Sequence, residues 1–223
     1  AQATGRWAEL IQNANTWLQA ETGRDKKIQL SLRLAKWYGE DLGRFDYAMP
    51  YYQQVTQLDP KNVAALRQMA SLYRKNAQWQ LVGQTLIQAL DVAVTETDRK
   101  EILTDLGDVC LNQLKETDEA LKYYNRALDV DSHFVPAITS LEKVYQERGQ
   151  FQDLARVLGQ KVHGLADDAQ IAATKLRIGA LEEQQLKNPE EAARQYREVL
   201  EIEASNLEAM RGLERVYGAL QRW

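Results

Sequence analysis

The chain has 223 residues, 44% hydrophobic and 27% charged, which is enough for one or two compact domains or for an elongated repeat array. Its formal net charge of -4 provides no uniformly basic surface for a phosphate backbone, which argues against a nucleic-acid partner. Only four prolines and twelve glycines interrupt many helix-forming residues, a composition typical of helices joined by short connections.

From its start, the chain repeats with a period of 72 residues. Positions at this offset keep the same residue character throughout the sequence. They include Trp7, Trp79, Phe151 and Trp223; Leu34, Leu106 and Ile178; Ala48, Ala120 and Ala192; Tyr52, Tyr124 and Tyr196; and Tyr73, Tyr145 and Tyr217. So many matches without a gap predict three copies of one unit, over about residues 7–78, 79–150 and 151–222.

Each copy is expected to hold four amphipathic helices, because apolar residues recur at intervals of three and four. In the middle copy these helices are predicted over residues 79–94, 98–113, 118–130 and 135–147. With a leading helix over residues 7–20, the chain would contain about five full hairpins and about 11 helices. No segment has the alternation of a strand, so the predicted fold class is all-α.

The expected helix boundaries carry recognisable signals. Three helix starts show an acceptor side chain followed three residues later by Glu or Gln, at Asp98, Asp167 and Asn188. Pro60 suits the first position of a helix. Gly43 and Gly149 lie between helices, where the turn is expected to need a positive φ.

The two hairpins of each unit, of about 35 and 37 residues, resemble the tetratricopeptide repeat. That family places a large residue, Leu, a small residue and Tyr on the first helix of a hairpin, and a small residue, an aromatic and Ala on the second. The matching residues are Leu66, Met69, Ala70 and Tyr73, then Leu103, Leu106, Gly107 and Cys110, and on a second helix Ala120, Tyr124 and Ala127. Cys110 and Glu182 depart from the pattern, since both replace the expected Tyr.

The resemblance implies a right-handed α-solenoid of antiparallel helical hairpins, forming one domain over residues 1–223. Trp223 would begin a fourth unit, so we expect the chain to be a segment of a longer array or of a multidomain protein. An uncapped apolar helix end near Trp223 also allows self-association.

The resemblance further implies a concave groove lined by the inward face of the first helices. The expected groove residues are Arg33, Lys36, Arg67, Ser71, Arg74, Lys75, Asp105, Asp108, Asn112, Lys143, Arg177, Arg211 and Arg215. The first two hairpins provide a basic stretch and the third an acidic one, which suits a peptide with charges of both signs. The alternative is an ordinary solvated helix face. The carboxylate clamp of the family is not reproduced in this sequence.

Catalytic and metal-binding patterns are absent from the sequence. His133, His163 and Cys110 are too widely spaced for a zinc site, and there is no phosphate-binding loop or serine elbow. We interpret His133 as a helix-start residue, His163 as a polar residue late in a helix, and Cys110 as a small buried hydrophobe. We therefore expect no cofactor, no metal and no enzyme activity.

The leading functional hypothesis is a protein-interaction scaffold that binds a peptide or helix of a partner in its groove. The alternative is a regulatory or structural module that packs in cis within a larger enzyme or signalling protein. A single cysteine favours the reducing cytoplasm, although a start at Ala1 without methionine leaves a removed targeting segment open. No apolar run approaches the ~18 residues of a membrane helix, so membrane insertion is not expected.

Overall fold

The protein is helical in the computed structural model, which describes residues 6–220, and no strand occurs in that range. The elements in chain order are α1 (Trp7–Ala20), α2 (Arg24–Lys36), the π-helical turn η1 (Trp37–Asp41), α3 (Phe45–Leu58), α4 (Val63–Lys75), α5 (Trp79–Val92), α6 (Glu96–Val109), the π-helical turn η2 (Cys110–Leu114), α7 (Thr117–Val130), α8 (Val135–Arg148), α9 (Phe151–Gly164), α10 (Asp168–Gln184), α11 (Pro189–Ile202) and α12 (Leu207–Leu220). The predicted all-α repeat fold is confirmed. The described residues hold one α-helix more than the count of about 11, because α12 follows the fifth hairpin.

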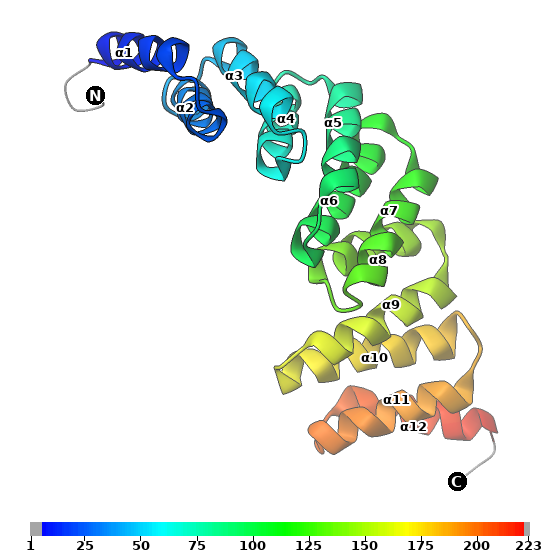
Figure 1. Ribbon diagram of the computed structural model, residues 1–223. Coiled ribbons are helices and arrows are strands. Elements are labelled where there is room, and N and C mark those ends of the chain that lie inside the picture. Colours follow the sequence, from blue (N-terminus) through cyan, green and yellow to red (C-terminus); the bar gives the residue numbers. More distant parts are fainter. Residues whose placement is uncertain (1–5, 221–223) are drawn as a thin grey trace. The chain divides into compact units, whose positions relative to one another are not determined.

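Two compact units make up the described chain, residues 6–115 with α1 to η2 and residues 116–220 with α7 to α12. Within each unit, a helix packs mainly against the helices before and after it in the sequence (Figure 1). Such packing between neighbours is how a repeat array buries the apolar stripe of each hairpin. A single solenoid over the whole chain remains a prediction. Trp223, which suggested a fourth unit, lies outside the described residues.

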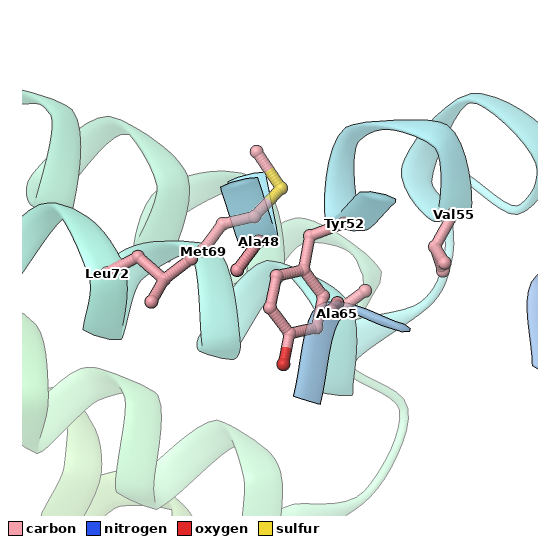
Figure 2. Close-up of a cluster of buried hydrophobic side chains, with 7 residues drawn as sticks. Ala48, Tyr52, Val55, Ala65, Met69 and Leu72 are labelled. Atoms are coloured by element: carbon pink, nitrogen blue, oxygen red, sulfur yellow. The ribbon is translucent and has the colours of Figure 1, made fainter. Parts of the chain in front are cut away.

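In the first unit, α2, α3 and α4 enclose a cluster of small and large apolar side chains. Its buried members are Ala35, Ala48, Tyr52, Val55, Ala65, Met69 and Leu72 (Figure 2). Ala48 and Ala65 have no exposed surface, and their small size lets the helix axes approach while Tyr52 fills the space beside them. The repeat pattern predicted this division between small and large residues.

The second compact unit holds two equivalents of Tyr52, and one of them, Tyr196 on α11, lies between two glycines. A Cβ atom at Gly179 of α10 would come within 2.7 Å of the ring, and one at Gly212 of α12 within 2.6 Å. Both distances are too short for any real Cβ contact, so the ring packs directly against helix backbone. The Tyr196 hydroxyl donates to Glu183 at 2.8 Å, which fixes the far end of the ring.

Two of the three predicted helix starts are confirmed. The side chains of Asp167 and Asn188 accept hydrogen bonds from backbone amides in the first turns of α10 and α11. The third prediction was wrong, because α6 begins at Glu96 and Asp98 lies inside it. Thr95 caps this helix, since its hydroxyl oxygen accepts from the Asp98 amide at 3.0 Å. Because Thr95 is the N-cap, the helix begins two residues earlier than predicted.

In the connections between helices, the prediction for Pro60 was wrong and those for Gly43 and Gly149 are confirmed. Pro60 lies in the turn before α4, and Asn62 caps that helix by accepting from the Ala65 amide at 3.0 Å. Gly43 and Gly149 have positive φ values, of 64° and 65°, as expected. The sequence period did not predict the two π-helical turns, because one additional residue in a turn leaves the apolar spacing almost unchanged.

Candidate functional site

The predicted groove residues of the first unit come together where α4 lies beside α6. Arg67 Nη1 is 2.8 Å from Glu101 Oε2 and 3.5 Å from Asp98 Oδ1. Further along α4, Arg74 Nη2 is 3.5 Å from Asp105 Oδ1. The expected basic and acidic stretches are therefore not separate surfaces at this point, because the arginines of one helix pair with the carboxylates of the next.

Two adjacent hollows open beside these ion pairs. The first, called the α4 hollow, has a volume of about 330 Å³ and is lined by Ala64, Arg67, Gln68, Ala70, Ser71, Arg74, Leu86 and Asp105. The second, called the Trp79 pocket, measures about 160 Å³ and is lined by Arg74, Trp79, Asp105, Asp108, Val109, Asn112 and Gln113. Six of the thirteen predicted groove residues thus line these two hollows: Arg67, Ser71, Arg74, Asp105, Asp108 and Asn112.

The second unit has a pocket on the corresponding helices, α8, α9 and α10. This Phe151 pocket has a volume of about 230 Å³ and is lined by Gln146, Phe151, Leu154, Arg177, Ala180, Leu181, Gln184 and Gln185. Behind it, Arg177 forms an ion pair with Glu142, which also accepts from Lys161 Nζ at 3.1 Å. Farther along, Arg215 of α12 binds both carboxylate oxygens of Glu183, at 2.8 and 2.9 Å.

Other predicted groove residues lie apart from these hollows. Arg33 lines a separate hollow of about 350 Å³ with Trp17 and Leu30. Lys36 pairs with Glu40 at 3.8 Å, and Lys75 lies 4.3 Å from the centre of the Phe45 ring. Lys143 and Arg211 are exposed and line none of the hollows described above. The thirteen predicted groove residues therefore do not all line one hollow, and their role in a groove remains a prediction.

The pocket aromatics were missed, since the groove residues predicted from the sequence include no aromatic side chain. Trp79 and Phe151 are half-buried, and each starts a second helix at the edge of a pocket. Trp17 is 60% exposed, so it is also a surface residue. Repetition at 72 residues could have identified Trp79 and Phe151 as equivalent, but not their degree of burial.

Two carboxyl groups of the second unit ionise more readily in the folded chain than in the unfolded one. Burial alone acts to raise the pKa of Glu142, but the hydrogen bonds from Arg177 and Lys161 outweigh it and the pKa is lowered. The hydrogen bonds from Arg215 lower the pKa of Glu183 against the opposing effect of burial, and the Tyr196 hydroxyl adds to the lowering. Both groups stabilise the fold while ionised.

We expect Glu183→Gln to reduce the free energy of unfolding by about 1 kcal/mol at pH 7, an amount kept small because Arg215 is half-exposed. A lowered folded-state pKa gives stability that is present above the ordinary value of 4.5 and is lost as the pH falls through the folded value. The difference between variant and wild type should therefore shrink toward about pH 2 in urea unfolding experiments. Glu201→Gln, at an exposed position of α11, is the control. A difference that persists at low pH would show that ionisation of Glu183 is not its cause.

The remaining residues that carry reactive chemistry are placed as follows. Cys110 is 7% exposed, which confirms its interpretation as a buried residue. His133 precedes α8 and His163 lies in the last turn of α9, with ring centroids 6.2 Å apart, a proximity that sequence spacing did not predict. Among residues 6–220 there is no group of three or more His, Cys, Asp or Glu that could hold a metal ion. No helix in this range is long and apolar enough to cross a membrane.

Comparison with known proteins connects this architecture to a family. The sequence model of the tetratricopeptide repeat matches residues 28–62 and 101–134, which cover most of the hairpins α2–α3 and α6–α7. A tetratricopeptide repeat protein from Parabacteroides merdae superposes with a TM-score of 0.57 at 14% identity, over 88% of this chain and 75% of that one. MamA gives a TM-score of 0.55 at 19% identity, over 81% of this chain and 93% of that one. The chain is a tetratricopeptide-like helical repeat protein.

Further relatives of this tetratricopeptide-like chain differ in function. YrrB, a tetratricopeptide repeat protein with an unusual peptide-binding site, has a TM-score of 0.52 at 15% identity, over 86% of this chain and 98% of that one. The probable UDP-N-acetylglucosamine–peptide N-acetylglucosaminyltransferase SPINDLY of Hordeum vulgare is 30% identical over 108 residues, 47% of this chain and 11% of that protein. Its Oryza sativa counterpart is 45% identical over 60 residues, 27% of this chain and 6% of that protein. The chain thus spans about a tenth or less of the length of these curated relatives.

Proposed function

We propose that this chain binds a peptide segment of a partner protein along the exposed face of its first helices, with the α4 hollow as one contact site. The observation that carries the proposal is the convergence of Arg67, Ser71, Arg74 and Asp105 on one hollow of about 330 Å³. The resemblance to the tetratricopeptide repeat predicts the same four residues on the inward face of the first helices. A first-helix face lined in this way provides both hydrogen-bonding groups and a shaped surface for a peptide.

The ion pairs between α4 and α6 support this function by fixing the walls of the hollow. Arg67 and Arg74 each contact a carboxylate of α6, so their side chains are held in place before a partner arrives. A preorganised wall costs less conformational entropy on binding than a mobile one. Lining groups of both signs further favour a partner segment that carries charges of both signs.

The test is to pan a phage library of random 12-residue peptides on the purified chain and to measure selected peptides by fluorescence anisotropy. The variant Ala64→Tyr with Gln68→Tyr blocks the α4 hollow from two exposed positions, one helical turn apart. We expect it to bind the selected peptides at least about tenfold more weakly while keeping its helical circular dichroism.

The matched control is Gln80→Tyr with Gln84→Tyr, which adds the same two rings at exposed positions of the second helix α5. It should bind as the wild type does. Failure to select any binding peptide would overturn the proposed function. Peptides that bind equally well to the blocked variant would exclude the α4 hollow as the contact site.

A further inference from the structure

The Trp79 pocket and the Phe151 pocket occupy the same position in successive 72-residue copies of the repeat, and one lies in each of the two compact units. Every residue that lines the Trp79 pocket has its counterpart, 72 positions later, among the residues that line the Phe151 pocket. The two pockets therefore occupy one structural position that the repeat has retained while its lining residues have changed. A comparison of the two sets of lining residues shows which residue types the two pockets share and which differ.

The aromatic wall and the amide groups are kept. Trp79 corresponds to Phe151, and both rings are half-buried at the first residue of a second helix. Asn112 corresponds to Gln184, so a side-chain amide lines both pockets. Volumes of about 160 and 230 Å³ are below the ~300 Å³ at which small-molecule pockets begin, and suit a single side chain. An aromatic face beside an amide can hold the stem of a side chain and bind its polar end.

The charge is what varies. In the Trp79 pocket, Arg74 contributes one positive charge and Asp105 and Asp108 two negative ones, which gives a net charge of -1. The corresponding positions of the Phe151 pocket hold Gln146, Arg177 and Ala180, which gives +1. A carboxylate has thus been replaced by a guanidinium at one position of the repeat, and the sign of the pocket is reversed.

The surroundings of the two pockets maintain these opposite signs. Burial raises the pKa of Asp105 although Arg74 and Arg67 act to lower it, so a cationic ligand group beside Asp105 would favour its ionised form. Around Arg177, the single carboxylate of Glu142 is shared with Lys161, so two cations face one anion. Each pocket therefore favours a ligand group of the opposite charge.

We propose that each of the two pockets selects a charged side chain of a bound peptide, and that the two select opposite charges. The Trp79 pocket takes a Lys or Arg, and the Phe151 pocket takes an Asp or Glu. In the first, the cation pairs with Asp105 and Asp108 while its methylene stem packs on the Trp79 ring. In the second, the carboxylate pairs with Arg177. This assignment rests on the proposed peptide-binding function and adds the partner chemistry to it.

The experiment transfers the lining of one pocket into the other. The triple variant Arg74→Gln, Asp105→Arg and Asp108→Ala gives the Trp79 pocket the residues of the Phe151 pocket at the three positions that differ in charge. The same random 12-residue peptide library is panned on the wild type and on this variant, and the selected sequences are compared. We expect the peptides enriched on the wild type to include basic residues and acidic residues, in the same sequence or in different ones. The variant should lose the enrichment of Lys and Arg and keep that of Asp and Glu.

Conservative variants test the same assignment by neutralising one charged side chain at a time, without introducing a residue of the opposite charge. Asp108→Asn should lower the affinity for a selected peptide about tenfold. It should not lower the affinity further when the basic residue of that peptide is replaced by norleucine. Arg177→Gln should behave in the same way toward replacement of an acidic residue of the peptide by Asn or Gln. These pairings keep the proposal testable even when the triple variant fails to fold.

The outcomes are distinguishable. The charge assignment alone is overturned if the peptides selected on the triple variant have the same composition as those selected on the wild type. It is also overturned if the conservative variants show no coupling to the peptide substitutions. No enrichment on the wild type overturns the proposed function and, with it, this inference. A loss of basic residues on the triple variant, together with coupling in both conservative pairs, supports the assignment of both pockets.

Discussion

Gly212→Val is expected to lower the free energy of unfolding by about 3 kcal/mol, because the new side chain has no room beside Tyr196. A Cβ atom at position 212 alone would lie 2.6 Å from two atoms of the ring. The ring cannot move away from it, since Gly179 lies against its opposite side and the Tyr196 hydroxyl is bound to Glu183. Urea unfolding followed by circular dichroism measures the loss.

The chain offers a matched control in Gly159→Val. Gly159 lies within α9, and a Cβ atom there would meet no atom within 4 Å. The same substitution should be neutral or slightly stabilising at this site, because valine has a higher helix propensity than glycine. In a Tyr196→Leu background the cost of Gly212→Val should fall below about 1 kcal/mol, since the ring it clashes with is gone. An equal cost in both backgrounds would show that the ring is not the obstacle.

The buried tyrosines show how much of the fold the sequence could predict. Tyr52, Tyr124 and Tyr196 share a register position, and all three are at most 4% exposed. A helix of known period places each of its residues on a definite face, so a repeated pattern of small and large residues identifies the faces that pack. The family resemblance, rather than the period, placed Arg67 of α4 and Asn112 of η2 on the inward face, and both line hollows.

Ion pairs between side chains of different helices were not predictable in this way. The pairing of Arg67 with Glu101 joins side chains whose contact depends on the separation and rotation of α4 and α6, which a period does not contain. The same is true of Glu142, whose pairing with Arg177 and Lys161 involves three different helices. The charge of a hollow follows from these contacts, so it could only be read from the structure.

Tyr52→Ala is expected to destabilise the first unit by about 4 kcal/mol, the cost of removing a large buried side chain and leaving a cavity. Tyr52 is 4% exposed and packs with Ala48, Met69 and Leu72 between α3 and α4 (Figure 2). In a repeat array each helix is stabilised mainly by its neighbours, so the loss should be local. Hydrogen exchange followed by mass spectrometry should therefore show faster exchange in α2, α3 and α4.

The amides of α10, α11 and α12 provide the internal reference, since these helices pack on a separate cluster around Tyr196. Their exchange should remain as in the wild type under the same conditions. Tyr47→Ala serves as the control substitution, because Tyr47 lies on the same helix but is 48% exposed, and it should cost less than about 1 kcal/mol. If Tyr52→Ala instead accelerated exchange equally in both units, the chain would unfold as one cooperative body, and the nearest-neighbour account of its stability would be wrong.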